Sequence, residues 1–347
     1  MENKFFLKSF LLGVLLLTAC TEGAPDTLNV ITHDSFMVSE NVVKIFEQKN
    51  SVKVNFILGG DAGSLLNQAI LTKSSPVADV LYGVDNTFLS RALEADLFEV
   101  YASPMLQTIP DEFKLDPTNQ ALPVDYGDVC INYDKVYFSS KGLPVPESLD
   151  DLLKPEYYAL LVVENPATSS PGLAFLIATI AHSGEESYLQ YWQKLKDNGV
   201  VVVNDWGTAY NTNFSAASGK GQQPMVVSYG TSPAAEVIFA SPRPSEAPTA
   251  SLVGTNACFR QIEFVGILKG TQKRALAEKF IDFMLDKTFQ EDMPLNMFVF
   301  PVNPTAVLPE EFVLYVQVPE KPASLPMQEI AAGRDGWIEA WRKVVLE

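Results

Sequence analysis

Aromatic side chains stand at the ends of two predicted strands, where they would face a ligand. Trp206 and Tyr210 follow the predicted strand 200–204, and Tyr229 ends a later apolar run. An aromatic face stabilises a cation by about 0.5–2 kcal/mol, depending on desolvation. Aromatic residues also dominate protein cores, so a structural role is the alternative. Because an Asp-Trp-Gly sequence at a strand end favours a cleft mouth, we predict that all three rings contact a ligand.

Hydroxyl groups gather in front of an apolar helix. Thr168, Ser169 and Ser170 are followed by Pro171 and by a helix predicted over 172–182. Hydroxyls and free backbone N–H groups at a helix N-terminus form a ready site for an anion such as phosphate. Ordinary capping by Ser170, with Pro171 at the first helical position, is the alternative. The two roles are compatible, because Ser169 can face the ligand while Ser170 caps the helix.

Several polar residues lie at predicted strand ends or crossings: His33, Asp34, Ser35, Asp61, Asp85 and Asp125. In the functional interpretation, one or two of the carboxylates face a cationic ligand. A turn or capping role is the alternative for each acid. Asp34 and Asp61 are the first candidates for ligand contact, while His33 either packs against the ligand or lines the lobe.

The first part of the chain alternates strands and helices. Strands are predicted at 27–33, 52–58 and 77–82, with helices at 41–48 and 64–71. This order predicts a parallel sheet with helices on both faces. Such sheets bind ligands at the carboxyl ends of their strands, which is where five of the six polar residues above lie.

A second series follows from Pro123. Strands are predicted at 124–133, 160–164, 200–204, 225–229 and 259–268, and further helices at 185–197, 272–285 and 327–345. The proline-rich stretch 241–248 is predicted to be a surface loop. We predict an α/β protein of two lobes, each a mostly parallel sheet flanked by helices, with the ligand cleft between them. Lobe I takes residues 27–122 and 258–307, and lobe II takes residues 123–257 and 308–347. Crossing segments near Pro123, near Ala257 and between Pro304 and Pro309 would allow hinge closure.

Residues 1–20 have the pattern of a lipoprotein signal peptide. A short basic start is followed by a mainly apolar run over 5–17 and by small residues before Cys20. The run is shorter than the roughly 20 apolar residues that span a bilayer. We therefore expect cleavage before Cys20, lipidation of this cysteine and a tether over 21–26. The protein would be extracytoplasmic and held at the membrane by lipid alone.

Composition excludes several function classes. The net charge of −17, from 25 Lys and Arg against 42 Asp and Glu, argues against nucleic acid or anionic lipid as the main partner. The chain has only two histidines, His33 and His182. They form no recognisable Ser-His-Asp or Cys-His set, and no spacing suggests the acid pair of a glycosidase. We expect a binding protein without enzymatic activity or cofactor.

Cys130 and Cys258 remain once Cys20 is set aside, and both lie in apolar, strand-like segments. In an oxidising compartment such a pair is a candidate disulfide. Two separate buried thiols are an equally good interpretation. The cysteines are too few for a structural zinc site, and we expect no bound metal.

Ten segments, taken in order, resemble the thiamine-binding periplasmic proteins of the type II solute-binding superfamily. They are 32–36, 63–67, 78–80, 83–86, 123–127, 166–173, 206–210, 228–234, 298–302 and 336–341. The resemblance covers nearly the whole mature chain. It departs at Phe298, where the family pattern Asn-Trp-Met-Tyr-Pro-Val usually has tryptophan.

This resemblance implies a type II periplasmic-binding-protein fold and a ligand that is thiamine or a thiamine phosphate. It also implies that Trp206 and Tyr210 form a stacking wall for the rings. Phe298 would still stack, with a smaller face, although a core role is nearly as good an interpretation. The protein would be a monomer that delivers its ligand to an ABC permease and its ATPase subunits.

A different cationic solute is the alternative ligand. Related iron-binding proteins use adjacent tyrosines, whereas Tyr229 stands alone between Ser228 and Gly230, which disfavours ferric ion. A polyamine would also use aromatic rings and carboxylates but would have little use for the anion site at 168–170.

Overall fold

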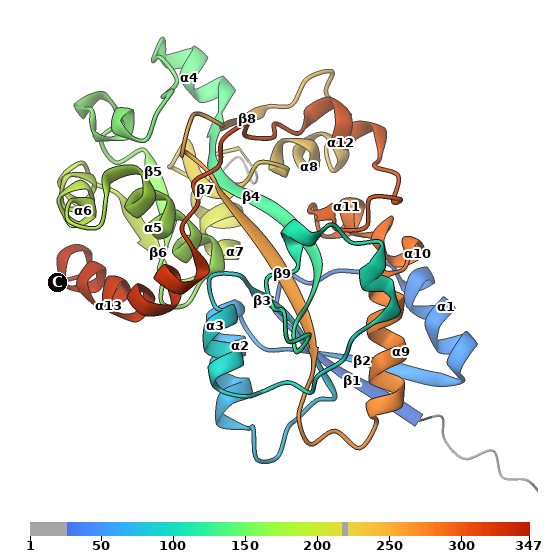
Figure 1. The fold of residues 1–347 in the computed structure, drawn as a ribbon. Helices are drawn as coiled ribbons and strands as arrows, with labels where there is room; N and C mark the ends of the chain where they lie inside the picture. Colours follow the sequence, from blue (N-terminus) through green and yellow to red (C-terminus); the bar gives the residue numbers. More distant parts are fainter. Residues whose placement is uncertain (1–25, 217–220) are drawn as a thin grey trace, which may run out of the picture.

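The structure is a computed structural model that describes residues 26–216 and 221–347, which form two α/β lobes joined by long strands (Figure 1). The strands are β1 (Asp26–Thr32), β2 (Val52–Leu58), β3 (Val80–Asp85), β4 (Leu122–Asp134), β5 (Leu161–Glu164), β6 (Val201–Val203), β7 (Met225–Tyr229), β8 (Thr249–Leu252), β9 (Phe259–Ile267) and β10 (Phe300–Pro301). Their order is β2-β1-β3-β9-β4-β7-β5-β6, with β8 and β10 each paired to β4.

Each lobe is centred on three parallel strands, as the strand and helix order predicts. In lobe I, β1 pairs in parallel with β2 and β3, and in lobe II β5 pairs in parallel with β6 and β7. The carboxyl ends of both sets therefore carry the segments that the sequence marks as polar or aromatic.

Two antiparallel strands connect the lobes. The first part of β4 pairs with β9 and its second part with β7, with the change of partner at Val129. At about 3.3 Å per residue, the 13 residues of β4 are long enough to run through both lobes. The connections near Pro123 and Ala257 are thus the beginnings of strands within one continuous sheet. The lobe boundaries themselves stay a prediction.

Helices cover the strands in both lobes (Figure 1). They are α1 (Glu40–Asn50), α2 (Ala62–Leu71), α3 (Leu89–Glu94), α4 (Lys135–Lys141), α5 (Ser170–Ser183), α6 (Tyr188–Asp197), α7 (Trp206–Thr208), α8 (Ser232–Ile238), α9 (Arg274–Leu285), α10 (Lys287–Gln290), α11 (Met293–Asn296), α12 (Glu310–Tyr315) and α13 (Met327–Val345). The predicted closing helix is confirmed as α13, which packs Trp341 edge-on against Trp192 of α6 at 5.5 Å between ring centroids. The short elements α8 and β8 lie outside the sequence-based expectation, because neither is long enough to show a clear hydrophobic period.

The N-terminal predictions fall mostly outside the described residues. The signal peptide, Cys20 and residues 21–25 of the tether belong to this part, while Asp26 already forms the first residue of β1. Among the described residues, no helix combines the length and apolar character that crossing a membrane requires.

Cys130 and Cys258 form a disulfide, which decides between the two interpretations of this pair. Cys130 lies in β4 and Cys258 directly precedes β9, with their Cα atoms 4.3 Å apart. The bond therefore joins the two connecting strands covalently.

Candidate functional site

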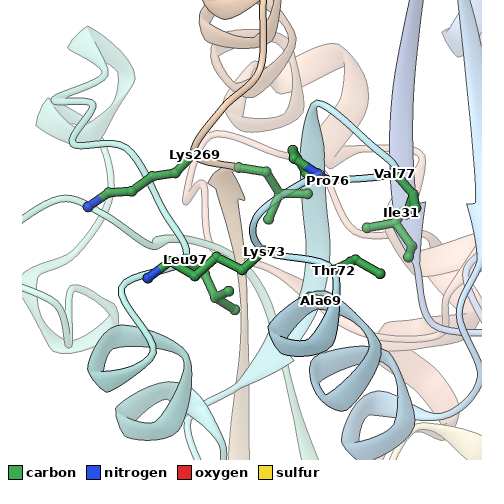
Figure 2. A pocket seen from close by; sticks show the side chains of 9 residues that line it. Ile31, Ala69, Thr72, Lys73, Pro76, Val77, Leu97 and Lys269 are labelled. Atoms are coloured by element: carbon green, nitrogen blue, oxygen red, sulfur yellow. The ribbon is translucent and has the colours of Figure 1, made fainter.

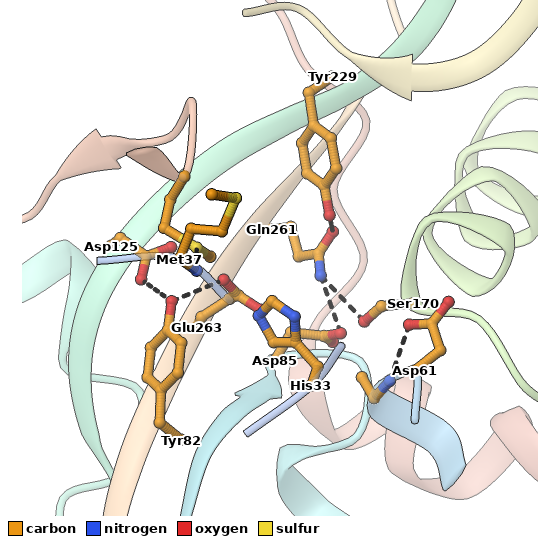
Figure 3. A network of polar contacts seen from close by, with 12 residues as sticks. His33, Met37, Asp61, Tyr82, Asp85, Asp125, Ser170, Tyr229, Gln261 and Glu263 are labelled. Atoms are coloured by element: carbon orange, nitrogen blue, oxygen red, sulfur yellow. Dashed lines mark hydrogen bonds and ion pairs between the residues drawn. The ribbon is translucent and has the colours of Figure 1, made fainter. Parts of the chain in front are cut away.

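Gln261 of β9 connects the two lobes through one buried amide (Figure 3). Its Nε2 donates to Asp85 at the end of β3 (3.0 Å) and to Ser170 at the start of α5 (2.9 Å). Its Oε1 accepts from the Tyr229 hydroxyl at the end of β7 (3.3 Å). Strand β9 thus joins, in one hydrogen-bond network, polar groups at the carboxyl ends of the parallel strands of both lobes.

Three acidic side chains form a row across neighbouring strands. Glu263 of β9 stands opposite Asp85 of β3 on one side and Asp125 of β4 on the other. All three are buried, and like charges side by side on a sheet destabilise it. The row therefore needs protons or compensating partners.

Protons and partners reduce the charge of this row. Burial raises the pKa of Asp85 to about 7, although its hydrogen bonds with Thr87 oppose the rise. Burial, together with the charge of Glu263, raises the pKa of Asp125. The Tyr82 hydroxyl lies 2.6 Å from Asp125 and 3.0 Å from Glu263, so its single proton serves one of them at a time.

His33 supplies positive charge beside the row. Its Nε2 lies 3.3 Å from the Glu263 carboxylate. Burial alone would lower the pKa of His33, but Glu263 raises it above its ordinary value. In return, His33 lowers the pKa of Glu263 against the opposing effect of burial. Gly83 makes room for the imidazole: its φ is +101° within a bulge of β3, and a Cβ there would lie 2.3 Å from the His33 ring.

An aromatic wall stands at the carboxyl ends of the lobe II strands. Trp206 and Tyr210 stack with ring centroids 5.0 Å apart and an interplanar angle of 16°. The Trp206 indole N–H donates to Ser228 of β7 (2.9 Å), and the buried Tyr210 hydroxyl donates to Glu236 of α8 (2.6 Å). Tyr210 therefore supports Trp206 from within the lobe, and the half-buried Trp206 is the ring available to a ligand.

The two serines at the start of α5 do not divide their roles as expected. Ser169 occupies the N-cap position with extended backbone (φ −116°, ψ 132°), and its side chain makes no capping bond. Ser170, expected to be the cap, is the first helical residue and accepts from Gln261. Helix ends are uncertain by one residue from sequence, and that shift redirects both hydroxyls.

Asp61 meets the same turn from lobe I. Its carboxylate caps α2 by accepting from the Ala62 N–H (2.7 Å). A Cβ on Gly63 would lie 3.0 Å from the Ala167 carbonyl oxygen, so α2 packs closely on the loop before α5. Burial raises the pKa of Asp61, and nearby Ser169 opposes the rise. The Ser169 hydroxyl nevertheless makes no hydrogen bond of normal geometry with any described residue.

The other predicted site residues lie outside this network. Asp34 accepts from the Gly60 N–H (2.9 Å) in an exposed turn that also contains Ser35. Thr168 donates its hydroxyl to the Asn204 carbonyl (2.6 Å). Phe298 has a left-handed backbone (φ +54°) and packs between Phe239 and Phe312, beside the cluster of Ala234 and Phe300. Nothing in this packing places Phe298 against the Trp206 ring.

Two hollows among the described residues lie outside this network, although the second reaches Phe36, whose ring centroid is 5.1 Å from that of Tyr82. Figure 2 shows a cavity of about 10 Å³, enough for about one water, lined by Ile31, Ala69, Thr72, Lys73, Pro76, Val77, Leu97, Leu268 and Lys269. It lies near the start of β3, the opposite end from Asp85. A groove of about 420 Å³ follows α1 and the edge strand β2 and includes Phe36, Met37 and Phe56.

Four polar residues of the lobe interface are missing from the sequence-based candidates: Tyr82, Glu164, Gln261 and Glu263. Each lies within or at the end of a strand that is mostly apolar. Gln261 and Glu263 are spaced two apart, so they share one face of β9. Two polar residues at this spacing within a buried strand are the sequence signal that could have identified Gln261 and Glu263 as site residues.

Comparisons with known proteins agree with this arrangement. The family model described as a bacterial extracellular solute-binding protein matches residues 75–312. The thiamine-binding periplasmic protein of Brucella suis is 32% identical over 345 residues, covering 96% of this chain and 97% of its own length. That of Salmonella typhimurium is 31% identical and covers 98% of this chain and 99% of its own.

A solved structure gives the same relationship in three dimensions. The structure described as a periplasmic thiamin binding protein superposes with a TM-score of 0.81 at 26% identity, covering 93% of this chain and 99% of the other. The predicted two-lobed type II fold is confirmed, and so is the expectation of a binding protein rather than an enzyme. This chain therefore belongs to the bacterial extracellular solute-binding proteins and, within them, to the thiamine-binding periplasmic protein family.

Proposed function

We propose that this chain binds thiamine or a thiamine phosphate between its lobes and delivers it to the permease of an ABC importer. The observation that carries the proposal is the Trp206–Tyr210 stack beside the buried acids, in a chain whose relatives are named thiamine-binding proteins. Thiamine joins a flat aminopyrimidine to a cationic thiazolium. An aromatic face and nearby carboxylates suit both parts.

The proposed binding mode uses groups from both lobes. One ring of the ligand lies on Trp206, and a phosphate tail lies at the start of α5, beside the Ser169 hydroxyl and the positive end of the helix. Asp61 approaches from lobe I, and closure of the lobes covers the ligand. Tyr229 and Asp85, which Gln261 joins, and His33 and Asp125, which lie beside Glu263 and Tyr82, form the polar wall behind the ligand and hold the lobe interface in place.

The location follows the family: the protein acts outside the cytoplasm as the solute-binding component of an importer. Lipidation at Cys20, a monomeric state and docking on a permease with its ATPase subunits complete the proposal. A Cys20→Ala variant should leave the membrane fraction when cells are fractionated. If it remains there in the same amount as the wild type, the lipid anchor is wrong.

Calorimetric titration of the chain starting after Cys20 tests the ligand. The protein is unfolded, dialysed and refolded so that no carried-over solute remains, and it is titrated with thiamine, its two phosphates and spermidine. Submicromolar binding of any thiamine form, with spermidine silent, supports the proposal. Binding of spermidine alone favours the polyamine alternative, and a ferric citrate titration addresses the iron alternative.

A further inference from the structure

Glu164 is a buried acid without a partner at the end of β5. Its side chain is fully buried, and neither carboxyl oxygen finds a hydrogen-bond partner within residues 26–216 and 221–347. An isolated carboxylate in such a place is very costly, so the group takes a proton instead. Burial indeed raises the pKa of Glu164 well above its ordinary value against the opposing effect of its own backbone N–H, and the nearby acids Asp61 and Asp205 add to the rise.

The strand register places Glu164 beside the aromatic wall. Val162 of β5 pairs with Val226 of β7, so Glu164, two residues further, reaches the level of Ser228. Side chains two apart share one face of a strand, and Val162 packs in one cluster with Tyr210 and Trp206. Ser228 accepts the Trp206 indole N–H. The register therefore places Glu164 on the same face of β5 as Val162, in the row of Ser228, to which the Trp206 indole donates.

The surroundings of Glu164 hold acids and hydroxyls. Asp61 approaches from the start of α2 and Asp205 from the end of β6, while Ser169 and Ser228 are neutral. The positive charge that would stabilise an ionised Glu164 has to come from outside this group of residues.

We propose that Glu164 exchanges a proton for a cationic ligand: it is an uncharged acid in the empty protein and becomes the counter-ion of a cationic aromatic ring held against Trp206. In this step the carboxyl O–H bond breaks and the proton passes to the solvent buffer. The fixed charge of the ligand replaces the proton, so the charge of the site is conserved. This inference rests on the proposed function and identifies the residue that makes the site selective for a cation.

Titration of the wild type in buffers of different ionisation enthalpy, at neutral pH, counts the protons released on thiamine binding. We expect about one proton for the wild type, none for Glu164→Gln, and affinity at least tenfold weaker in that variant. Glutamine keeps the shape of the protonated acid but cannot ionise. Glu156→Gln, an exposed change in lobe II, is the matched control and should behave as the wild type.

Failure of this inference differs from failure of the ligand assignment. A wild type that binds thiamine without releasing a proton, or a Glu164→Gln variant that releases the same number, overturns the inference. A folded wild type that binds no thiamine form refutes the ligand assignment alone.

If no thiamine form binds, the pH dependence of stability of the empty protein still tests whether Glu164 carries a proton. A raised folded-state pKa stabilises the protein below the unfolded pKa, and this stability is lost as pH rises through the folded value. The wild type should lose stability relative to Glu164→Gln as the pH rises above the ordinary carboxyl pKa of about 4. Parallel stability curves for the two proteins would overturn the proposal.

Discussion

The two sides of the lobe interface differ in how their polar groups are satisfied. On the lobe I side, each acid of the row Asp85–Glu263–Asp125 has at least one hydrogen bond or ion pair within the protein, although the second oxygen of Asp125, His33 Nε2 and the Thr32 hydroxyl find no hydrogen-bond partner among the described residues. On the lobe II side, Ser169, Thr231 and Glu164 carry buried oxygens that find no partner among the described residues. A buried polar group without a partner costs about 1–3 kcal/mol. Glu164, with neither carboxyl oxygen paired, therefore gains most from a ligand, whereas each lobe I acid keeps at least one partner and maintains the interface.

Removal of the disulfide tests whether the covalent bond between the two connecting strands stabilises the interface between the lobes. The double variant Cys130→Ser, Cys258→Ser opens a cross-link between residues 128 apart in sequence. We expect a loss of about 2–4 kcal/mol in the free energy of unfolding, measured by denaturant titration. Reduction of the wild type should give the same loss. An unchanged midpoint in both cases would show that the strands need no covalent connection.

Tyr82→Phe tests the lobe I side. It removes the hydroxyl shared by Asp125 and Glu263, and we expect about 2 kcal/mol less stability with little change in ligand affinity. Tyr133→Phe, a half-buried tyrosine of β4, is the matched control. Should Tyr82→Phe weaken binding more than it weakens stability, the lobe I acids would belong to the ligand site itself.

Trp206→Ala tests the lobe II side. We expect at least tenfold weaker thiamine binding, or about 1.4 kcal/mol, in a protein that stays folded by circular dichroism. Trp206→Phe retains an aromatic face without the N–H bond to Ser228 and should lose less. Unchanged affinity in folded Trp206→Ala would contradict the stacking assignment.

The smallest expected effect separates the two serines of α5. Ser169→Ala should weaken binding of thiamine phosphates by about 0.5–1.5 kcal/mol and leave thiamine binding unchanged, as measured by calorimetry. Ser170→Ala should instead reduce stability, because Ser170 accepts from Gln261. Equal effects of Ser169→Ala on all ligand forms would show that Ser169 does not bind the phosphate.

The sequence predicts the strand and helix order well, because long apolar runs alternate with amphipathic helices in both lobes. Local pattern also finds the groups at the carboxyl ends of parallel strands, such as Asp61, Asp85 and Trp206. It does not find Gln261 or Glu263. Their importance depends on which strands lie next to β9, a long-range property that no local spacing encodes.

Other differences arise at the scale of a single residue. Ser169 takes the N-cap position in place of Ser170 because α5 begins one residue earlier than the proline suggests. Phe298 keeps the place of an aromatic residue in the family pattern, yet it packs among Phe239 and Phe312. Glu164 reads as the last residue of an apolar strand, and only the structure shows that its carboxyl has no described partner.

A crystal structure of the chain with thiamine bound would test the central claim most directly. We predict a ligand ring on the half-buried face of Trp206, with Glu164 and Ser169 newly paired to the ligand or to water beside it, and the Gln261 network unchanged. A ligand that lies against Asp85 and Asp125, displaces Gln261 and leaves Glu164 without a partner would contradict the account.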